Sequence, residues 1–281
     1  MTILLTGGTG FIGQHVLRLL LEGGYSVRAV VRPRTDTKNI KNENLEIMYR
    51  NLCDVSIEDI RGCDTLIHLA AYGVTDGMNN WSECFRVNVT ESLALMLNCI
   101  DAGLRRFIIC GSCFEYGQSG ELYDFIPADA MLRPMGAYHA SKASASIAAW
   151  ALSVSKNIEM AILRPFHVYG EGESLGRLYP SLLEAAKTGR DFPMTEGNQI
   201  RDFVHVYDVA CSIVSYVESD HLVAGVPVIK NLGSGKPVTV YDFCERIWRE
   251  NNATGKLQRG IVPYRANEVM RFVPAIKDEV R

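Results

Sequence analysis

The sequence predicts an α/β fold with a doubly wound parallel sheet and a smaller C-terminal α/β lobe. Short apolar segments alternate with helical apolar spacing through the first 165 residues of the 281-residue chain. A glycine-rich turn directly follows the first apolar segment. After residue 165, glycine, proline and polar residues break the pattern into short pieces. Strands that alternate with helices imply right-handed crossovers and therefore a mostly parallel sheet.

The first strand is expected at residues 3–5, because this apolar run ends in glycines. A helix follows, with Phe11, Val16 and Leu20 at helical spacing, and Gly23-Gly24 ends it. Later strands are expected at residues 27–31, 45–49, 65–69, 107–110, 160–163 and 228–232.

Two further helices are expected on the main sheet. One covers residues 81–102 and carries Leu93, Leu97 and Ile100 on one face. The other is the Ala- and Ser-rich stretch 138–155.

These elements divide the chain into a main domain, residues 1–165, and a smaller lobe, residues 166–281. Segments near residues 200–211 and 226–233 are expected to return to the main domain. No internal repeat or low-complexity tract is visible.

The bulk composition is that of an ordinary globular protein. The chain is 47% hydrophobic and carries a net charge of −3, with no concentration of basic residues. Nothing in it demands nucleic acid or a membrane surface. No apolar run reaches the roughly 18 residues that span a bilayer, and no signal peptide is recognised. We therefore expect a cytoplasmic protein with reduced cysteines.

The stretch "TGGTGFIG", residues 6–13, lies between the first strand and the first helix. Its glycines allow a tight turn and let backbone N–H groups approach a pyrophosphate at the helix N-terminus. This context predicts a dinucleotide-binding loop rather than a bare structural turn. The expected contacts are Gly7, Thr9, Gly10, Phe11, Ile12 and Gly13.

The end of the second strand bears on the choice of dinucleotide. An acid about 20 residues past the glycines holds the ribose hydroxyl of NAD. Here Arg32 stands near that point, with Arg34 behind it. A guanidinium suits a 2′-phosphate, so NADP(H) is favoured and NAD(H) stays possible. The alternative is a solvated basic loop.

Three polar residues form a candidate catalytic group. Tyr138 and Lys142 are four residues apart in "YHASK" and share a helix face. The ammonium is expected to lower the phenol pKa, which makes Tyr138 a usable general acid. Ser112 ends the strand 107–110 and can donate to the same carbonyl oxygen. No metal-ligating pattern is predicted.

With these motifs the chain resembles the extended short-chain dehydrogenase/reductases, the NAD-dependent epimerase/dehydratase family, which have a Rossmann-type sheet. The resemblance covers nearly the whole chain. Its motifs are "TGGTGFIG", Asp54, "HLAA" at 68–71, Asn88, "GSCFEYG", "YHASK", "RPFHVYG" at 164–170 and "RDFVHVYDVA" at 201–210.

The resemblance implies that Ser112, Tyr138 and Lys142 are the catalytic triad. Asp54 would meet the adenine, and Asn88 would support the helix beside the active site. The implied cofactor contacts beyond the glycine loop are Arg32, Asp54, Val55, Leu69, Ala70, Ala71, Asn88, Tyr138, Lys142, Pro165 and His167.

The same resemblance implies a nucleotide-sugar substrate. Arg201 would contact its diphosphate, although an ion pair with Asp202 or Asp208 is the alternative. His167 replaces the usual Asn, and either contacts substrate or is a core histidine. The implied substrate contacts are Tyr72, Ser112, Cys113, Phe114, His167, Arg201 and Arg265.

The stretch "ICGSCFEYG", residues 109–117, separates several chemistries. Its Cys-x-x-Cys spacing suggests a redox dithiol, but the first cysteine falls in a buried strand, which disfavours that interpretation. Dehydratases of this family carry Asp-Glu after the catalytic hydroxyl, where Cys113 and Phe114 stand here. Glu115, one residue later, would point to the other face of a strand-like segment.

Among family members, "CFEYG" and "PYRANEVM" at 263–270 resemble nucleotide-sugar 4-ketoreductases, such as the CDP-abequose and CDP-paratose synthases and dTDP-6-deoxytalose-forming reductases. The expected reaction is NADPH-dependent reduction of a nucleotide-activated 4-keto-6-deoxyhexose in deoxysugar biosynthesis. The alternatives are an NAD-dependent 4-epimerase and a non-catalytic dinucleotide sensor. Retention of the triad argues against the sensor.

Relatives commonly form homodimers through a four-helix bundle. The helices that start near residues 81 and 138 are the candidates here. The alanines expected to allow close approach are Ala143, Ala145, Ala148, Ala149 and Ala151.

Overall fold

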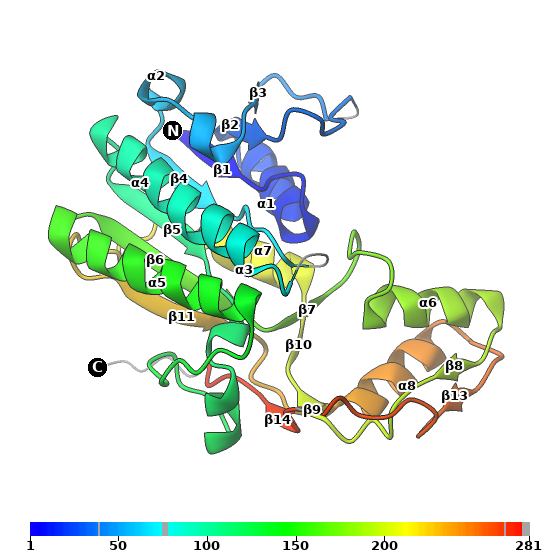
Figure 1. Ribbon diagram of the computed structural model, residues 1–281. Coiled ribbons are helices and arrows are strands. Elements are labelled where there is room, and N and C mark those ends of the chain that lie inside the picture. The colour runs from blue at the N-terminus through cyan, green and yellow to red at the C-terminus, as the bar shows by residue number, and fades with distance from the viewer. Residues whose placement is uncertain (39, 75–77, 267, 277–281) are drawn as a thin grey trace.

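A seven-stranded parallel sheet forms the centre of the protein, with strand order β11-β6-β5-β4-β1-β2-β3 (Figure 1). The computed structural model describes residues 1–38, 40–74, 78–266 and 268–276. The strands of this sheet are β1 (Thr2–Thr6), β2 (Ser26–Val31), β3 (Leu45–Tyr49), β4 (Thr65–His68), β5 (Arg106–Cys110), β6 (Glu159–Pro165) and β11 (Val228–Leu232). The strand order reverses between β1 and β4, where open α/β sheets bind ligands. The predicted α/β fold with a doubly wound parallel sheet is therefore confirmed.

Helices cover both faces of the sheet (Figure 1). On one face α1 (Phe11–Glu22) packs beside α7 (Val206–Ser215). On the other lie the short α2 (Ile57–Ile60), α4 (Ser92–Asp101) and α5 (Ala137–Lys156). Strands between two helical layers are buried on both sides, so they read as continuous apolar runs.

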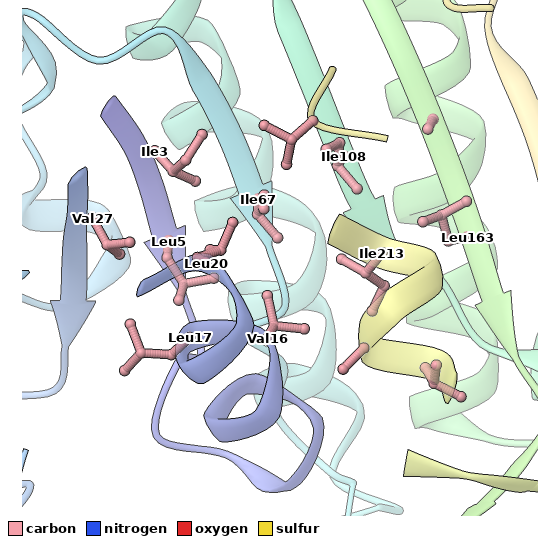
Figure 2. Packing of buried hydrophobic residues seen from close by; sticks show 14 of the residues in the cluster. Ile3, Leu5, Val16, Leu17, Leu20, Val27, Ile67, Ile108, Leu163 and Ile213 are labelled. Atoms are coloured by element: carbon pink, nitrogen blue, oxygen red, sulfur yellow. The ribbon is translucent and has the colours of Figure 1, made fainter. Parts of the chain in front are cut away.

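The packing of β1 shows this arrangement most directly. Ile3 and Leu5 face α1, where they meet Val16 and Leu20, and all four side chains are fully buried (Figure 2). Leu4, between them, points into the opposite core cluster under α4. Successive side chains of β1 thus pack into the cores on opposite faces of the sheet. This packing fixes the position of the strand and of the turn that follows it.

The predicted helix 81–102 is interrupted. It consists of α3 (Trp81–Phe85), the π-helical segment η2 (Arg86–Glu91) and then α4. Within α4 the buried residues are Ser92, Leu95, Met96 and Cys99. Of the three residues predicted to share one face, Leu93 and Ile100 are half-buried and pack against the core, whereas Leu97 is 37% exposed. The wider π turn shifts the register of the following residues, and an apolar-spacing argument does not detect it.

The smaller lobe lies at one side of the sheet (Figure 1). Its apolar cluster lies between α6 (Leu178–Thr188) and α8 (Val240–Glu250), with β8 (Phe192–Pro193) and β13 (Leu257–Gln258) beside them. Short strands connect this lobe to the sheet: β7 (His167–Tyr169) with β10 (Phe203–His205), and β9 (Ile200–Arg201) with β12 (Val238–Thr239) and β14 (Arg271–Phe272). Across the described residues, no helix has the length and apolar character needed to cross a membrane.

Candidate active site

The glycine loop between β1 and α1 is built by close backbone packing. Gly7 has φ 74°, and a Cβ there would lie 2.6 Å from the Ala70 nitrogen. A Cβ on Gly13 would lie 1.9 Å from the Gly7 oxygen. Gly10 precedes α1 without a side-chain cap, so the first N–H groups of the helix face the loop. The loop therefore has the form of an anion-binding helix terminus.

The predicted loop contacts share this turn. Thr9 and Gly10 are exposed, whereas Phe11 and Ile12, at the start of α1, are half-buried. The wall opposite them follows β4. The Leu69 N–H donates to the Thr6 oxygen at 3.1 Å. The residues after β4 are thereby held against the glycine loop, and Leu69, Ala70 and Ala71, the cofactor contacts predicted there, are half-buried.

The carboxyl ends of β2 and β3 carry Arg32 and Asp54. Both side chains are exposed. Arg32 has no side-chain partner among the residues that the structure describes, so its guanidinium is available to a ligand. Asp54, in the short turn η1 (Leu52–Asp54), accepts a hydrogen bond from Asn51 Nδ2 at 2.8 Å. Val55 is buried in the core, so its side chain cannot contact a ligand.

Ser112, Tyr138 and Lys142 come together at the end of β5. Ser112 precedes the 3₁₀ turn η3 (Cys113–Glu115), and its Oγ accepts the Phe114 N–H at 3.2 Å. The phenol of Tyr138, in the first turn of α5, hydrogen-bonds the Ser112 side chain. Lys142 donates to the Cys110 oxygen at 2.6 Å. All three side chains are buried. The structure thus assembles the predicted triad.

The expected effect on the Tyr138 phenol was wrong in direction. Burial is the largest influence and raises the pKa of Tyr138, while the hydrogen bond with Ser112 acts to lower it. Lys142 donates to the Cys110 oxygen at the end of β5. Sequence spacing places Tyr138 and Lys142 on one helix face but does not reveal how far the fold removes the phenol from water.

Asn88 connects three parts of the site. Its Nδ2 donates to Ser141 Oγ on α5 at 2.9 Å. Its Oδ1 accepts the Tyr72 N–H at 2.7 Å, and Nδ2 also donates to the Tyr72 oxygen at 3.0 Å. Asn88 lies in the π-helical segment η2. It thus supports α5 and the loop after β4, the arrangement predicted for it.

The two cysteines of "ICGSCFEYG" form no disulfide. Cys110 and Cys113 are both free, and burial raises the pKa of each thiol. Cys113 is 2% exposed and packs in an apolar cluster with Phe166 and Phe272. The structure therefore contradicts the prediction that Cys113 contacts substrate, because the 3₁₀ turn directs its side chain into the core.

Glu115 is fully buried. Its Oε2 accepts the Arg164 Nε–H at 2.8 Å, and its Oε1 accepts the Ser112 N–H at 2.8 Å. The predicted strand-like segment is a 3₁₀ turn, so the argument from alternating strand faces does not apply here.

An aromatic wall stands beside the triad, made of Phe114, His139 and His167. Phe114 is 36% exposed and stacks on His139 with ring centroids 4.9 Å apart. His167 meets the same ring edge-on at 6.2 Å. Burial lowers the pKa of His139, and burial with the nearby Arg201 charge lowers that of His167 to about 3. Both imidazoles are neutral. Sequence reasoning missed His139, although its place next to Tyr138 was a usable signal.

Arg201 is paired, but with neither residue named in the alternative. Its Nη2 donates to Glu268 Oε1 at 2.7 Å. Asp202 instead accepts the Ser234 N–H at 2.8 Å, which ties the loop after β11. Arg265 is exposed and has no side-chain partner within the described chain. Glu268 was not predicted, because no local pattern links it to Arg201.

A hollow of about 220 Å³ adjoins Glu268, at some remove from the triad. Its lining residues are Gln118, Glu121, Met135, Ala266, Glu268 and Val269. In the described parts of the chain, no group of three or more His, Cys, Asp or Glu side chains could hold a metal ion. Pro165, at the end of β6, is buried.

Comparison with known proteins agrees with this geometry. The sequence profile of the NAD dependent epimerase/dehydratase family matches residues 3–229. CDP-abequose synthase of Salmonella muenchen is 29% identical over 95% of this chain and 87% of its own length. A UDP-glucose 4-epimerase of Corynebacterium glutamicum is 28% identical over 87% of this chain and 79% of its own.

Among solved structures, the UDP-N-acetylglucosamine 4-epimerase from Methanobrevibacter ruminantium, in complex with UDP-N-acetylmuramic acid, superposes with a TM-score of 0.88. It is 24% identical, and the match covers 99% of this chain and 90% of that one. At this identity the structural similarity supports the fold alone, that is, the central sheet and the smaller lobe described above.

Proposed function

Because the chain belongs to the NAD dependent epimerase/dehydratase family, we propose that it reduces the 4-keto group of a nucleotide-activated 4-keto-6-deoxyhexose. The cofactor would be NADPH. CDP-abequose synthase is among the relatives that match nearly the whole chain, and a dTDP-6-deoxy-L-talose 4-dehydrogenase of Aggregatibacter actinomycetemcomitans matches 96% of it at 23% identity. All of these relatives belong to a family of NAD-dependent enzymes that modify nucleotide sugars.

The residues at the carboxyl end of the sheet fit a dinucleotide. The close packing at Gly7 and Gly13 leaves room for backbone rather than side chains at the uncapped start of α1. That cradle would hold the pyrophosphate. The guanidinium of Arg32, for which the described residues provide no side-chain partner, would take a 2′-phosphate, which supports NADPH over NADH. When bound, the reduced nicotinamide supplies the hydride that carbon C4 accepts.

The triad would handle the oxygen of the reacting carbonyl. Ser112 Oγ accepts the Phe114 N–H and hydrogen-bonds the Tyr138 phenol, so the two hydroxyls lie together where both would donate to the carbonyl oxygen. Tyr138 would give its proton to the oxygen as C4 is reduced. The raised phenol pKa keeps Tyr138 protonated and ready to act as the acid. Lys142 would stabilise the resulting phenolate from the same helix face.

One observation carries the choice of a reductase over a dehydratase. Elimination needs a carboxyl group that can exchange protons with the sugar. Glu115, whose charge reaches the Tyr138 phenol, is committed to Arg164 and to the Ser112 N–H. Phe114 and two neutral imidazoles form the accessible wall instead. This wall supports redox chemistry at the carbonyl without elimination.

A 4-epimerase is the second candidate, because UDP-glucose 4-epimerases match most of this chain at a similar identity. It would use the same triad but keep its dinucleotide bound and return the hydride to the other face of the sugar. The two candidates therefore differ in whether the cofactor is exchanged at each turnover.

We also propose a homodimer. The outer faces of α4 and α5 expose the large apolar side chains of Leu97, Ile147, Trp150 and Val154. Of the five alanines predicted to allow close approach, Ala143, Ala145 and Ala149 are buried in the protein's own fold, whereas Ala148 is half-buried and Ala151 is exposed. A second copy that covers the exposed apolar residues would form a four-helix bundle.

The test is oxidation of NADPH and NADH by the purified protein with dTDP-, CDP- and GDP-4-keto-6-deoxyhexoses. We expect oxidation that depends on one of these sugars and is faster with NADPH. Tyr138→Phe should lower kcat by about 10²- to 10⁴-fold. No oxidation with any sugar, with NAD released only on denaturation and interconversion of UDP-hexoses, would establish the epimerase instead.

A further inference from the structure

Directly behind the catalytic Ser112 lies a buried carboxylate that the proposed chemistry does not use. Glu115 has no exposed surface. Its carboxylate accepts hydrogen bonds from the Ser112 N–H and the Arg164 Nε–H, both at 2.8 Å, and from the Ser146 side chain on α5. Three elements that carry or flank the triad therefore meet on one side chain.

Arg164 continues this cluster away from the site. It is 2% exposed on β6, and its Nη1 donates to the Tyr116 hydroxyl and to the Ala128 oxygen, each at 2.9 Å. The Tyr116 hydroxyl in turn donates to Asn231 Oδ1 on β11 at 2.6 Å. The ends of β5, β6 and β11 are thus joined by one fully hydrogen-bonded polar network.

A contribution to stability does not by itself explain why Glu115 and Arg164 form a buried ion pair here. Removing two charges from water costs several kcal/mol per ion, and apolar residues of the same volume often replace a buried ion pair without loss. What distinguishes Glu115 is its position. It closes a reciprocal capping box with Ser112, whose side chain accepts from the turn while Glu115 accepts from the Ser112 backbone.

We propose that Glu115 is a positioning residue of this active site: it holds Ser112 in place and, balanced by Arg164, sets the electrostatic potential at the Tyr138 phenol. The proposal rests on the proposed function only in taking Ser112 and Tyr138 as catalytic, and it holds for a reductase and an epimerase alike.

The effect of removing the Glu115 charge depends on the other groups around the Tyr138 phenol. Cys110 on β5 and Cys113 on η3 are buried thiols, and His139 on α5 is a neutral imidazole. The charged groups are Lys142 on α5, Glu115 on η3 and, beyond Glu115, Arg164 on β6. The negative charge of Glu115 raises the pKa of Tyr138. Its removal should therefore favour the phenolate.

The first test is Glu115→Gln, which removes the charge at nearly constant volume. In the reduction, activity falls at high pH as Tyr138 loses its proton, and this fall should begin at lower pH in the variant than in wild type. The double variant Glu115→Gln/Arg164→Gln restores the net charge of the cluster. In this double variant, activity should fall at the same high pH as in wild type, even if kcat remains lower.

Glu115→Asp separates position from charge. It keeps the charge but withdraws the carboxylate from the Ser112 N–H, so kcat should fall about 10- to 100-fold with the pH profile unmoved and KM little changed. The control is Glu159→Gln, which breaks the Arg106–Glu159 ion pair at the opposite ends of the same two strands. It should lower Tm without moving the pH profile.

The ionisation of Tyr138 can also be measured without substrate, so this proposal can be tested separately from the proposed function. The ultraviolet titration of wild type minus that of Tyr138→Phe reports the phenol itself, and Glu115→Gln should shift it to lower pH. If Glu115→Gln lowers Tm and kcat uniformly, with both titrations as in wild type, Glu115 is structural only and the proposal fails. Absence of any sugar reduction in wild type bears on the proposed function alone.

Discussion

The directions of the hydrogen bonds around the buried His68 show which nitrogen of its ring carries the proton. The Ala70 N–H donates to Thr6 Oγ1, which lies 2.7 Å from His68 Nδ1. On the other side Ser92 Oγ donates to the Val87 oxygen and lies 2.9 Å from His68 Nε2. Because Ser92 uses its hydrogen for the Val87 oxygen, Nε2 carries the ring proton. Burial keeps the ring neutral, so Nδ1 accepts the hydrogen of the Thr6 hydroxyl.

Acid should weaken the fold through this residue. Burial, with the Lys142 charge, lowers the pKa of His68 to about 3. Between about pH 6.5 and pH 3 the unfolded chain therefore binds a proton that the folded chain does not, and stability is lost as pH falls through that window. We expect the free energy of unfolding in urea to drop by about 2 kcal/mol from this site between pH 7 and pH 5.

His68→Gln should be less stable than wild type at pH 7 but lose less on acidification. The exposed His221→Gln is the control and should follow the wild-type pH dependence. An unchanged pH dependence in His68→Gln would contradict the neutral, buried state of the ring.

At the scale of elements, the junction of β1, the glycine loop and α1 depends on the absence of side chains. The loop carbonyl of Gly7 fills the space where a Gly13 side chain would stand. Helix and strand are therefore packed at backbone distance, which is what brings the helix terminus to the ligand.

Gly13→Ala should open this junction. Because the new Cβ meets backbone rather than a flexible side chain, α1 must move away from the loop. We expect the dissociation constant for the dinucleotide cofactor to rise more than tenfold, with a destabilisation of about 1–3 kcal/mol. The matched control is Gly24→Ala, at the other end of α1, where φ is 77° and nothing lies within 4 Å. That variant should cost about 1 kcal/mol in stability and leave cofactor affinity unchanged. Equal affinities for both variants would contradict the close-packed junction.

At the scale of the whole molecule, the apolar surface over α4 and α5 predicts an assembly. Trp150 is 42% exposed and Ile147 is 62% exposed, although both lie on a helix whose inner face is well buried. Exposed large apolar groups clustered on one helical face are typical of an interface.

Trp150→Glu should convert a dimer into a monomer, because an unpaired charge would be buried at the interface. Sedimentation velocity measures this directly. The control is Leu175→Glu, on a loop of the smaller lobe, where the side chain is 87% exposed; it should remain dimeric. A wild-type protein that sediments as a monomer at all concentrations would refute the assembly.

The sequence was most informative where a pattern is local. The strand at 160–163 is a continuous apolar run because parallel strands are buried on both faces, and the triad follows from short motifs. The pairs Glu115–Arg164 and Arg201–Glu268 join residues far apart in the chain, so spacing carries no sign of them. The raised pKa of Tyr138 escaped prediction for the same reason, since burial is a property of the completed fold.

The strand order has a consequence for how the chain is made. β6 lies between β5 and β11 and is buried along almost its whole length, yet β11 follows it only after much of the smaller lobe. On the ribosome β6 therefore emerges with an open apolar edge, and the chain must complete much of the lobe before the last strand can cover it. An open strand edge of this kind pairs readily with other chains. Chains that end between residues 166 and 227 should accordingly aggregate, and the nascent protein should depend on chaperones over that same interval.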